Sequence, residues 1–443
     1  MKIFRRRNKY YCKAASSSLL FQPSGDVGPC YYNRGYIFGK YPEKSIDEIW
    51  DSINRKNLIK SIKNAKFNLG CYQCKKDIDA GLFYSSGISK YDFIEIDKKE
   101  SKFPSLMAFQ LDNICNLECI MCSGEYSHLI RKNREKALAY ISPYNDNFVE
   151  QLKKYIPHLK IAVFTGGEPL LIPLYYKIWD KIIRLNPNMS VTITSNGTVL
   201  NDSIKEYFEK MNVSITVGID AVDAEVYENI RVNARLDKTL KNIEYFNNYC
   251  SRKNTKFEIK TLITPQNYKV VQNLFYYFSE RGIIIMPKLA VMPFYSSMMS
   301  LSVEELDHVV LHLSTLIYNE EDEIAKINFS RLNEMTQQIK QMRNNLILDI
   351  DNYKSYSLVD LKVLLIEYLK TTYESKVYLS PNEFDFYQKQ IDIVFDKIDD
   401  EGVLRNAVLC LIKIPGDLIL NEMNRSELEK FIARVKQTGE YYI

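Results

Sequence analysis

With 443 residues, the chain is too long for one ordinary domain, and two or three domains are expected. Its 59 basic and 55 acidic side chains nearly balance, and a net charge of +4 gives no indication of nucleic-acid binding. No window approaches about 18 uninterrupted apolar residues, so no membrane span is expected. The basic N-terminus is not followed by the apolar segment of a signal peptide. A cytoplasmic protein is predicted.

The first region, residues 1–102, is irregular in pattern and rich in cysteine. Of the nine cysteines in the chain, seven lie within the first 122 residues, and this clustering favours metal ligation over disulfides. Four thiolates belong to the region: Cys12, Cys30, Cys71 and Cys74. Four thiolates suit zinc and a [4Fe–4S] cluster alike, so a zinc ribbon and an iron–sulfur domain both stay open. One helix is expected over residues 45–65.

The second region, residues 103–295, alternates short apolar runs with helical patterns. The runs SLMAFQL, KIAVFTGG, SVTITSNG, VSITVGID, FEIKTLIT and IIIMPKLAV are interpreted as strands. Six strands that alternate with helices predict parallel βαβ units, in either an open doubly wound sheet or a full or partial (β/α) barrel. In both folds ligands bind at the carboxyl ends of the strands. The third region, residues 296–443, contains helical patterns and little strand.

Three cysteines, Cys115, Cys119 and Cys122, directly follow the first of these six strands, in the spacing C-x3-C-x2-C. Thiolates select iron–sulfur clusters, zinc or Cu(I). Three clustered thiolates suit three corners of a [4Fe–4S] cubane and leave the fourth iron open. A structural zinc ion needs four ligands, so the alternative is a zinc site completed by a distant residue such as His128.

Further motifs follow the next two strands at the same predicted edge. FTGGEPLL contains Gly166 and Gly167, which let the backbone approach a ligand closely, and Glu168, which can accept hydrogen bonds from a cationic amine. TSNGTVL follows the third strand. Together with C-x3-C-x2-C, these motifs make residues 103–295 resemble the radical S-adenosylmethionine (SAM) superfamily.

This resemblance implies a partial (β/α)6 TIM-type barrel within an α/β protein that has a small N-terminal iron–sulfur domain and a helical C-terminal region. It implies that the three clustered cysteines hold a [4Fe–4S] cluster whose open iron binds SAM. It also implies a set of SAM contacts, namely Met121 beside the adenine, Gly166, Gly167 and Glu168 at the amino group, and Ser195 and Asn196 along the pocket.

After the fourth strand the chain reads Gly218-Ile219-Asp220-Ala221, followed by Arg231. Many members of the superfamily have Ser-apolar-Asp-Gly here, so Asp220 and Arg231 match the pattern while Gly218 and Ala221 depart from it. Because Gly218 lacks the hydroxyl, we expect Arg231 to carry more of the recognition of the SAM carboxylate through its planar fork of donors. A solvent-exposed helix arginine is the alternative.

The N-terminal region resembles the twitch form of the SPASM domain. The matching features are the G-x4-C spacing from Gly25 to Cys30, the helix SIDEIWDS and the closing C-x2-C. The resemblance implies an auxiliary [4Fe–4S] cluster held by the four N-terminal cysteines. A closed set of four ligands leaves no open iron, which favours electron transfer or scaffold support over substrate binding.

The two resemblances together imply an enzyme that takes an electron from a flavodoxin or ferredoxin. It would reductively cleave SAM to a 5′-deoxyadenosyl radical and abstract hydrogen from a substrate. The substrate is expected to be a ribosomally made peptide that is oxidatively cross-linked or epimerised, and a small molecule such as a carbohydrate or cyclitol is the alternative. Cys250 and Cys410 are interpreted as core thiols, with a hydrogen-atom donor as the other reading. A zinc-ribbon binding protein with a silent barrel is the alternative from another class.

Overall fold

The computed structural model describes residues 11–79, 86–94, 102–291, 293, 296–319, 321–375, 382–425 and 427–440. The chain forms two compact units. The first comprises Met1–Glu118, Ser123–Val217 and Lys238–Phe257, and the second comprises Cys119–Cys122, Gly218–Asp237 and Glu258–Ile443. These units cut across the three expected regions 1–102, 103–295 and 296–443, whose boundaries stay predictions. No described helix combines the length and apolar character that crossing a membrane requires.

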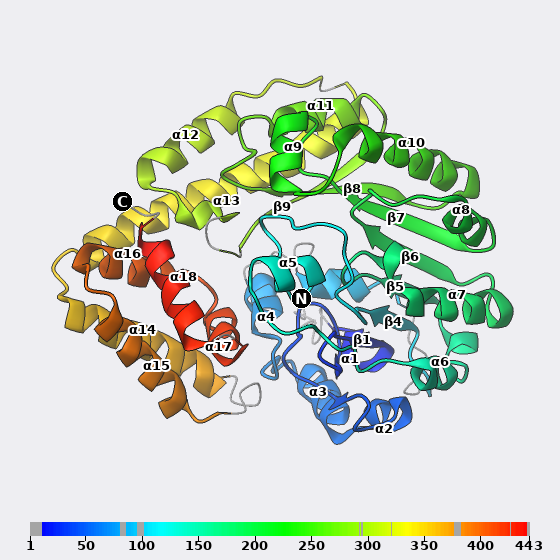
Figure 1. Ribbon diagram of the computed structural model, residues 1–443, viewed down its shortest axis with the longest axis horizontal. Coiled ribbons are helices and arrows are strands. Elements are labelled where there is room, and N and C mark those ends of the chain that lie inside the picture. Colours follow the sequence, from blue (N-terminus) through cyan, green and yellow to red (C-terminus); the bar gives the residue numbers. More distant parts are fainter. Residues whose placement is uncertain are drawn as a thin grey trace, which may run out of the picture. The chain divides into compact units, whose positions relative to one another are not determined.

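The sheet of the first unit is mostly parallel and follows the order β3-β2-β1-β4-β5-β6-β7. Figure 1 labels β1 and β4 to β7 of this sheet. Its strands are β1 (Ser18–Phe21), β2 (Asp26–Gly28), β3 (Gly39–Lys40), β4 (Leu106–Phe109), β5 (Ile161–Phe164), β6 (Ser190–Ser195) and β7 (Asn212–Gly218). Strands β1 and β4 to β7 pair in parallel, whereas β2 and β3 are antiparallel to their neighbours. The cysteine-rich N-terminal region therefore extends the same sheet through β1.

Helices follow the parallel strands of this unit, as the alternating pattern predicted. They are α6 (Asp146–Leu152), α7 (Pro173–Leu185), α8 (Asp202–Glu209) and α10 (Leu236–Lys253). Helix α7 begins with Pro173, whose fixed φ suits a first helical position, and it buries Tyr175, Ile178, Trp179 and Ile182 at helical spacing. Strands β6 and β7 alternate fully buried with half-buried side chains, so one face packs on helices and the other stays more open.

The N-terminal region contains α1 (Ala14–Ser17), α2 (Ile46–Trp50), α3 (Ile53–Lys63) and α4 (Tyr72–Asp79), and α5 (His128–Asn133) follows the cysteine loop. The prediction of one helix over residues 45–65 was wrong, because α2 ends and α3 begins around Ser52. Ser45 and Glu48 form a capping box on α2, and the Ser52 side chain accepts a hydrogen bond from Arg55 N–H to cap α3. A second cap thus interrupts the continuous apolar pattern.

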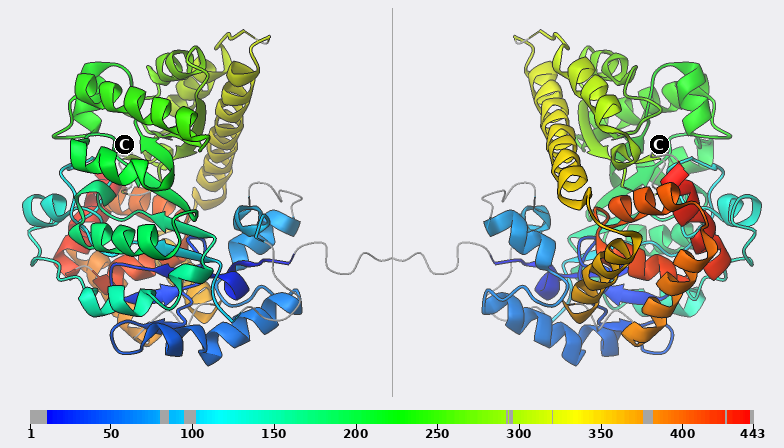
Figure 2. Two further views of the ribbon diagram at one scale, coloured as in Figure 1. Left: turned by 90° about the vertical axis from the view of Figure 1, so that its right-hand side faces the viewer. Right: turned by 90° about the vertical axis from the view of Figure 1, so that its left-hand side faces the viewer.

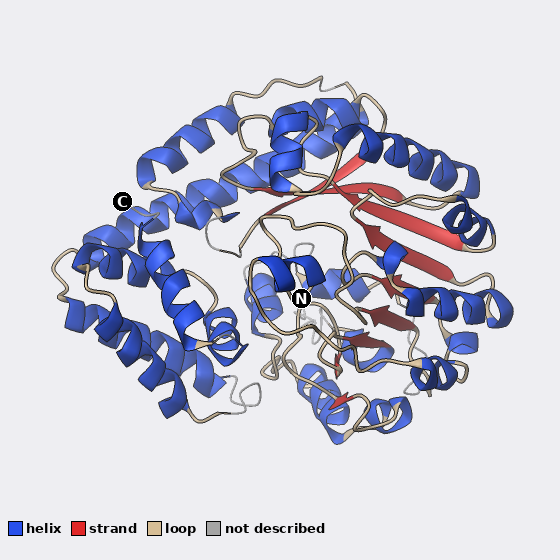
Figure 3. Cartoon of the chain, viewed as in Figure 1, coloured by secondary structure: helices blue, strands red, loops and turns tan. Residues whose placement is uncertain are grey.

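In the second unit β8 (Phe257–Ile263) and β9 (Ile284–Leu289) pair in parallel. Together with β4 to β7 they make six strands that alternate with helices, which confirms the predicted α/β class; all six are drawn in red in Figure 3. The helices of this part are α9 (Ala224–Ile230), α11 (Val271–Ser279), α12 (Val303–Ser314) and α13 (Glu323–Tyr353), the last visible in yellow in Figure 2. Asn328 of α13 accepts a hydrogen bond from Ile285 N–H at 2.8 Å, so α13 satisfies a backbone donor of β9.

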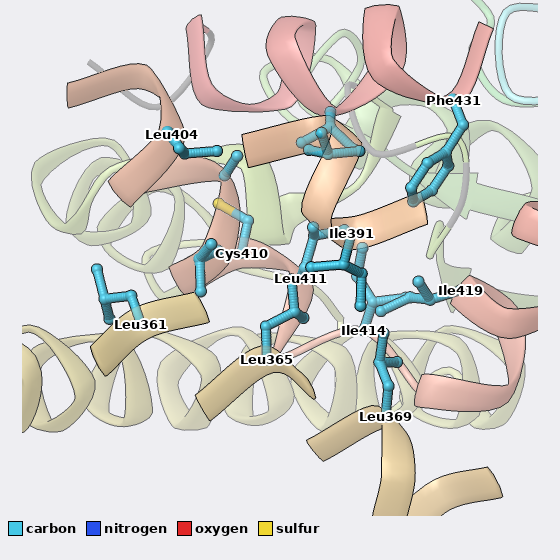
Figure 4. Packing of buried hydrophobic residues seen from close by; sticks show 14 of the residues in the cluster. Leu361, Leu365, Leu369, Ile391, Leu404, Cys410, Leu411, Ile414, Ile419 and Phe431 are labelled. Carbon is cyan, nitrogen blue, oxygen red and sulfur yellow. The ribbon is translucent and has the colours of Figure 1, made fainter. Parts of the chain in front are cut away.

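The C-terminal part is helical, as predicted. It consists of α14 (Leu358–Ser375), α15 (Phe384–Lys397), α16 (Glu401–Leu411), α17 (Gly416–Arg425) and α18 (Leu428–Glu440). These helices share one apolar core, in which Leu361, Leu365 and Leu369 repeat every four residues along α14 (Figure 4). Cys410 is fully buried in this core, as expected for a core thiol.

Candidate functional site

The four N-terminal cysteines come together in the first unit. Cys12 precedes α1, Cys30 follows β2, and Cys71 and Cys74 lie at the start of α4. Each is buried, and the Cys30 thiol interacts electrostatically with the other three. No disulfide joins any of the nine cysteines, all of which lie among the described residues. In the part of the chain that the structure describes, no three His, Cys, Asp or Glu side chains converge tightly enough for a single metal ion.

The chemistry of this pocket fits a cationic iron–sulfur core. Burial raises the pKa of Cys12 and of Cys71 to about 12, and it raises the pKa of Cys30 well above its ordinary value. Four thiolates in such surroundings repel one another unless iron compensates their charge. Asn33 Nδ2 donates to Cys71 Sγ at 3.3 Å, and Gly87 N–H donates to Cys74. These two donors to sulfur were missed by the sequence analysis, and no spacing rule pointed to them.

The turn that contains Gly166 and Gly167 lies directly against the loop that leads to Cys115. Gly167 N–H donates to the Asp112 carbonyl at 3.1 Å, and Glu168 N–H donates to the Ile114 carbonyl at 2.7 Å. Gly166 has a φ of +115°, and a Cβ at Gly167 would overlap the Ile114 carbonyl oxygen. Both positions therefore require glycine for the approach of two backbone segments. The predicted approach of this turn to a ligand stays a prediction.

Glu168 is completely buried and its carboxylate binds the end of the neighbouring strand. One oxygen accepts hydrogen bonds from the Ser195 hydroxyl at 2.9 Å and from Leu170 N–H at 3.1 Å. The other accepts from Asn196 N–H at 2.7 Å. These three donors occupy most of the acceptor capacity of a carboxylate. The structure thus brings three of the predicted SAM contacts, Glu168, Ser195 and Asn196, into one hydrogen-bonded group.

Asn196 connects this group to the cysteine loop. Its Nδ2 lies 3.8 Å from Cys115 Sγ and donates to Asn116 Oδ1 at 3.0 Å. Thr198 N–H donates to Asn196 Oδ1 at 2.9 Å, and Asn116 Nδ2 donates to Thr198 Oγ1 at 2.8 Å. Asn116 and Thr198 were missed by the sequence analysis, although both lie inside the motifs CNLEC and TSNGT.

A cavity of about 370 Å³ opens beside the same loop. Its lining includes Asp112, His128, Arg131, Lys132 and Tyr140. His128 Nδ1 accepts a hydrogen bond from Cys115 N–H at 3.2 Å, so the imidazole contacts the backbone of the cysteine loop. Burial raises the pKa of Asp112, while hydrogen bonds from Asn113 and Ile114 N–H oppose the shift. The walls of this cavity thus combine charged side chains with the apolar side chains of Ile114, Ala137 and Ala139.

The second unit contains the rest of the cysteine loop. Cys122 N–H donates to the Cys119 carbonyl at 3.1 Å, which makes a tight turn. Ile120 N–H donates to the Ile230 carbonyl at 2.9 Å and ties this turn to the end of α9. Cys119 is buried, whereas Met121 and Cys122 are half-buried. A half-buried Met121 retains surface that could contact an adenine ring.

Asp220 and Arg231 form a buried ion pair in this unit. Arg231 Nε donates to Asp220 Oδ2 at 2.7 Å, and the two side chains are 12% and 0% exposed. Leu262 N–H donates to Asp220 Oδ1 at 2.8 Å, so each carboxylate oxygen of Asp220 accepts a hydrogen bond. Burial alone lowers the pKa of Arg231, but the charges of Asp220 and Cys119 raise it overall. Arg231 is therefore not a solvent-exposed helix residue.

Gly218, which stands where the superfamily pattern has serine, lies directly beside the Arg231 guanidinium. A Cβ at this position would lie 2.9 Å from Arg231 Nη2 and 3.2 Å from Nη1. The guanidinium thus occupies the space beside the bare Cα. Asn267 Nδ2 also donates to the Asp220 carbonyl at 2.8 Å, a contact that the sequence analysis missed because no motif surrounds Asn267.

Comparison with known protein families indicates which class of protein this is. Residues 110–268 match the radical SAM superfamily. More particularly, residues 12–75 match the SPASM iron–sulfur cluster-binding domain, which here precedes the barrel strands. The predicted cofactors are those that these two families imply, namely a SAM-binding [4Fe–4S] cluster, an auxiliary [4Fe–4S] cluster and SAM.

The similarity to individual proteins is partial. An AdoMet-dependent heme synthase of Methanosarcina barkeri is 25% identical over 188 residues, which cover 41% of this chain and 49% of the synthase. A cysteine-type anaerobic sulfatase-maturating enzyme of Clostridium novyi is 22% identical over 178 residues, covering 38% and 46%. The solved structure of anSMEcpe with bound AdoMet has 17% identity and a TM-score of 0.37, covering 48% of this chain and 59% of that one. The chain spans about half the length of the curated relatives it matches.

Proposed function

We propose that the chain is an enzyme that reductively cleaves SAM to a 5′-deoxyadenosyl radical and abstracts hydrogen from a substrate. The observation that carries this proposal is the hydrogen-bonded group of Glu168, Ser195 and Asn196. It joins the two strand-end motifs typical of the superfamily and reaches Cys115 through Asn196 Nδ2. A hydrogen-bonded group that joins these motifs to the cysteine loop supports SAM binding better than it supports a silent barrel.

Within this proposal Cys115, Cys119 and Cys122 would hold a [4Fe–4S] cluster, which would supply the electron for cleavage of SAM. The Glu168 carboxylate accepts hydrogen bonds from three donors and so fixes the ends of β5 and β6, with acceptor capacity left for one further donor. The amino group of SAM then meets the Gly166–Glu168 turn at the remaining acceptor capacity of that carboxylate.

The other proposed SAM contacts lie in the second unit. Met121 presents its thioether to the adenine ring, a contact to which flexible methionines are suited. Arg231 uses Nε for Asp220, so recognition of the SAM carboxylate falls to its Nη groups. Asp220 holds the guanidinium in orientation and keeps its own charge compensated.

Cys12, Cys30, Cys71 and Cys74 would hold the auxiliary cluster with a complete set of protein ligands. Such a cluster serves electron transfer or supports the scaffold. The electron donor is a flavodoxin or ferredoxin, and the protein acts in the cytoplasm. The helical region 296–443 is available to bind substrate.

We propose a ribosomally made peptide as the substrate, with oxidative cross-linking or epimerisation as the reaction. The relative that is named for maturation of a sulfatase supports an enzyme that acts on a polypeptide. A small-molecule dehydrogenase or epimerase is the second candidate, and the relative named as a heme synthase favours it.

Anaerobic purification and reconstitution test the proposal. The enzyme should be brown, contain about eight irons per chain and form 5′-deoxyadenosine from SAM under dithionite. A colourless protein that retains zinc would overturn it in favour of a zinc-ribbon binding protein. Formation of S-adenosylhomocysteine instead would indicate methyl transfer.

A further inference from the structure

The segment CYYNR, from Cys30 to Arg34, connects the two cysteine-bearing parts of the first unit. Its first residue is one of the four N-terminal cysteines. Asn33 N–H donates to the Cys30 carbonyl at 3.3 Å, and Asn33 Nδ2 donates to Cys71 Sγ at the same distance. One end of the segment thus contributes a cysteine to the auxiliary site and contacts a second cysteine of that site.

The other end of the segment is Arg34, which binds the ends of two neighbouring strands. Its Nε donates to Gln22 Oε1 at 3.1 Å, and its Nη2 donates to Gln110 Oε1 at 2.7 Å. Gln22 directly follows β1 and Gln110 directly follows β4, two strands that pair in parallel. Both glutamines are buried, and Gln22 Nε2 donates back to the Arg34 carbonyl at 2.8 Å. The planar guanidinium therefore holds both strand ends at once.

The strand end that Arg34 holds leads directly into the cysteine loop. Gln110 lies five residues before Cys115. Beyond the loop, Arg34 Nη2 lies 3.9 Å from Glu125 Oε1, and the guanidinium lies 5.6 Å from the centre of the Tyr126 ring. The ion pair is long and about one third exposed, so it adds little stability. The two hydrogen bonds to the glutamines make the connection.

The same strand end contacts the turn proposed to meet the amino group of SAM. A Cβ at Gly166 would lie only 3.4 Å from Gln110 Cα, so the two backbones are in close contact. Tyr31 adds a weaker contact, because its Oη lies 3.4 Å from Thr165 Oγ1, just before this turn. A shift of the segment that contains Tyr31 and Arg34 would therefore reach the proposed SAM site.

We propose that Arg34 is a positioning residue that couples the auxiliary site to the SAM site. A cluster held by the four N-terminal cysteines would fix Cys30 against Cys71, and Arg34 would pass this constraint to the strand end before Cys115. The inference rests on the proposed function and gives the N-terminal region a role in SAM binding. Because such coupling is reciprocal, an occupied auxiliary site and bound SAM favour each other.

Equilibrium dialysis of SAM with the reconstituted protein tests this coupling through a double-mutant cycle. Cys71→Ala disrupts the auxiliary site and should lower SAM affinity about fivefold or more. Arg34→Gln should lower it by a similar factor while iron stays at about eight per chain. The double variant should lose no more than either single variant, because both changes release the same segment. A loss equal to the product of the two single losses would overturn the proposal.

Gln110→Met interrupts the same connection from the other side. It removes the acceptor at the end of β4 and leaves Arg34 bound to Gln22, so its SAM affinity should resemble that of Arg34→Gln. Its loss should likewise not add to that of Cys71→Ala. If Arg34→Gln loses iron or fails to fold, this second cycle decides the test. Normal SAM affinity of Gln110→Met would overturn the proposal.

Arg34→Lys separates geometry from charge. Lysine keeps the charge but lacks the planar fork that spans two acceptors, so this variant should bind SAM as weakly as Arg34→Gln. Full SAM affinity in Arg34→Lys would overturn the bridging role.

Arg252→Gln is the matched control, at an exposed arginine of α10 that pairs with Glu209. It should bind SAM like the natural protein and leave the effect of Cys71→Ala unchanged. A natural protein that binds SAM but forms no 5′-deoxyadenosine would refute the proposed function alone, because the coupling is measured by binding. Independent losses in a protein that does cleave SAM would refute the coupling alone.

Discussion

The hydroxyl of Ser195 donates a hydrogen bond of 2.9 Å to the buried carboxylate of Glu168. The contact joins the end of β6 to the turn after β5, two segments that 26 residues separate in the sequence. Since the same carboxylate also accepts from Asn196 N–H at 2.7 Å, it fixes the backbone of both strand ends. Glu168 thus has a positioning role in addition to the proposed contact with the SAM amino group.

Glu168→Gln should weaken both the fold and SAM binding. The amide can accept at only one end, so a donor now faces Ser195 or Asn196 and at least one buried hydrogen bond is lost. We expect the free energy of unfolding to fall by about 1–3 kcal/mol. SAM affinity, measured by equilibrium dialysis, should fall at least tenfold. Glu206→Gln on the exposed side of α8 is the control and should change neither quantity. Normal stability of Glu168→Gln would contradict the assigned contacts.

Gly218→Ala tests the packing of the buried ion pair. The new Cβ would lie 2.9 Å from Arg231 Nη2, so the guanidinium must move and its 2.7 Å contact with Asp220 must weaken. A loss of about 1–3 kcal/mol in urea unfolding is expected. In an Asp220→Asn, Arg231→Met background the same change should cost much less, because no guanidinium is there to displace. An equal cost in both backgrounds would refute the steric explanation.

The strand positions and the glycine-rich turn could be predicted because their signals are local. Alternating apolar runs marked β4 to β9, and the motifs marked the strand ends at Glu168 and Ser195. Strand β1 could not be foreseen: its four residues, SLLF, directly follow a run of serines, and its partner β4 lies some 85 residues away in the sequence. The break between α2 and α3 depended on the cap at Ser52.

The site was predicted in its residue types more than in its contacts. The assignment of Gly166 and Gly167 to ligand approach stays a prediction, and the sequence did not reveal that they also lie against the Asp112 and Ile114 carbonyls. Donors to sulfur such as Asn33 depend on tertiary contacts that no sequence spacing encodes. The role of Arg231 as a SAM contact stays a prediction, and its burial against Asp220 is a tertiary contact that the sequence pattern did not reveal.

Lys413, which lies just after α16, predicts how the stability of the protein depends on pH. Burial lowers its pKa, while Cys410 and Asp349 oppose the shift. Because the unfolded chain binds the proton more tightly, the ammonium costs stability at neutral pH, and this cost disappears as pH rises towards the unfolded pKa of about 10.4. Lys413→Met should therefore be more resistant to urea than the natural protein at pH 7, and the difference should shrink by pH 10. Lys370→Met, at an exposed site, should show no such trend; a difference that grows with pH would contradict the assignment.

Cys119→Ala separates the two proposed clusters. Cys119 is one of the three cysteines proposed to hold the SAM-binding cluster. Its loss leaves two thiolates, too few to retain a cubane with an open iron. Iron should fall from about eight to about four per chain, and formation of 5′-deoxyadenosine should cease. Cys71→Ala should lower iron by a similar amount while the SAM-binding cluster remains, seen as an electron paramagnetic resonance signal that SAM still perturbs. Cys250→Ala, at a buried thiol of α10, should retain all the iron. If Cys119→Ala still cleaves SAM, the three cysteines do not hold the catalytic cluster.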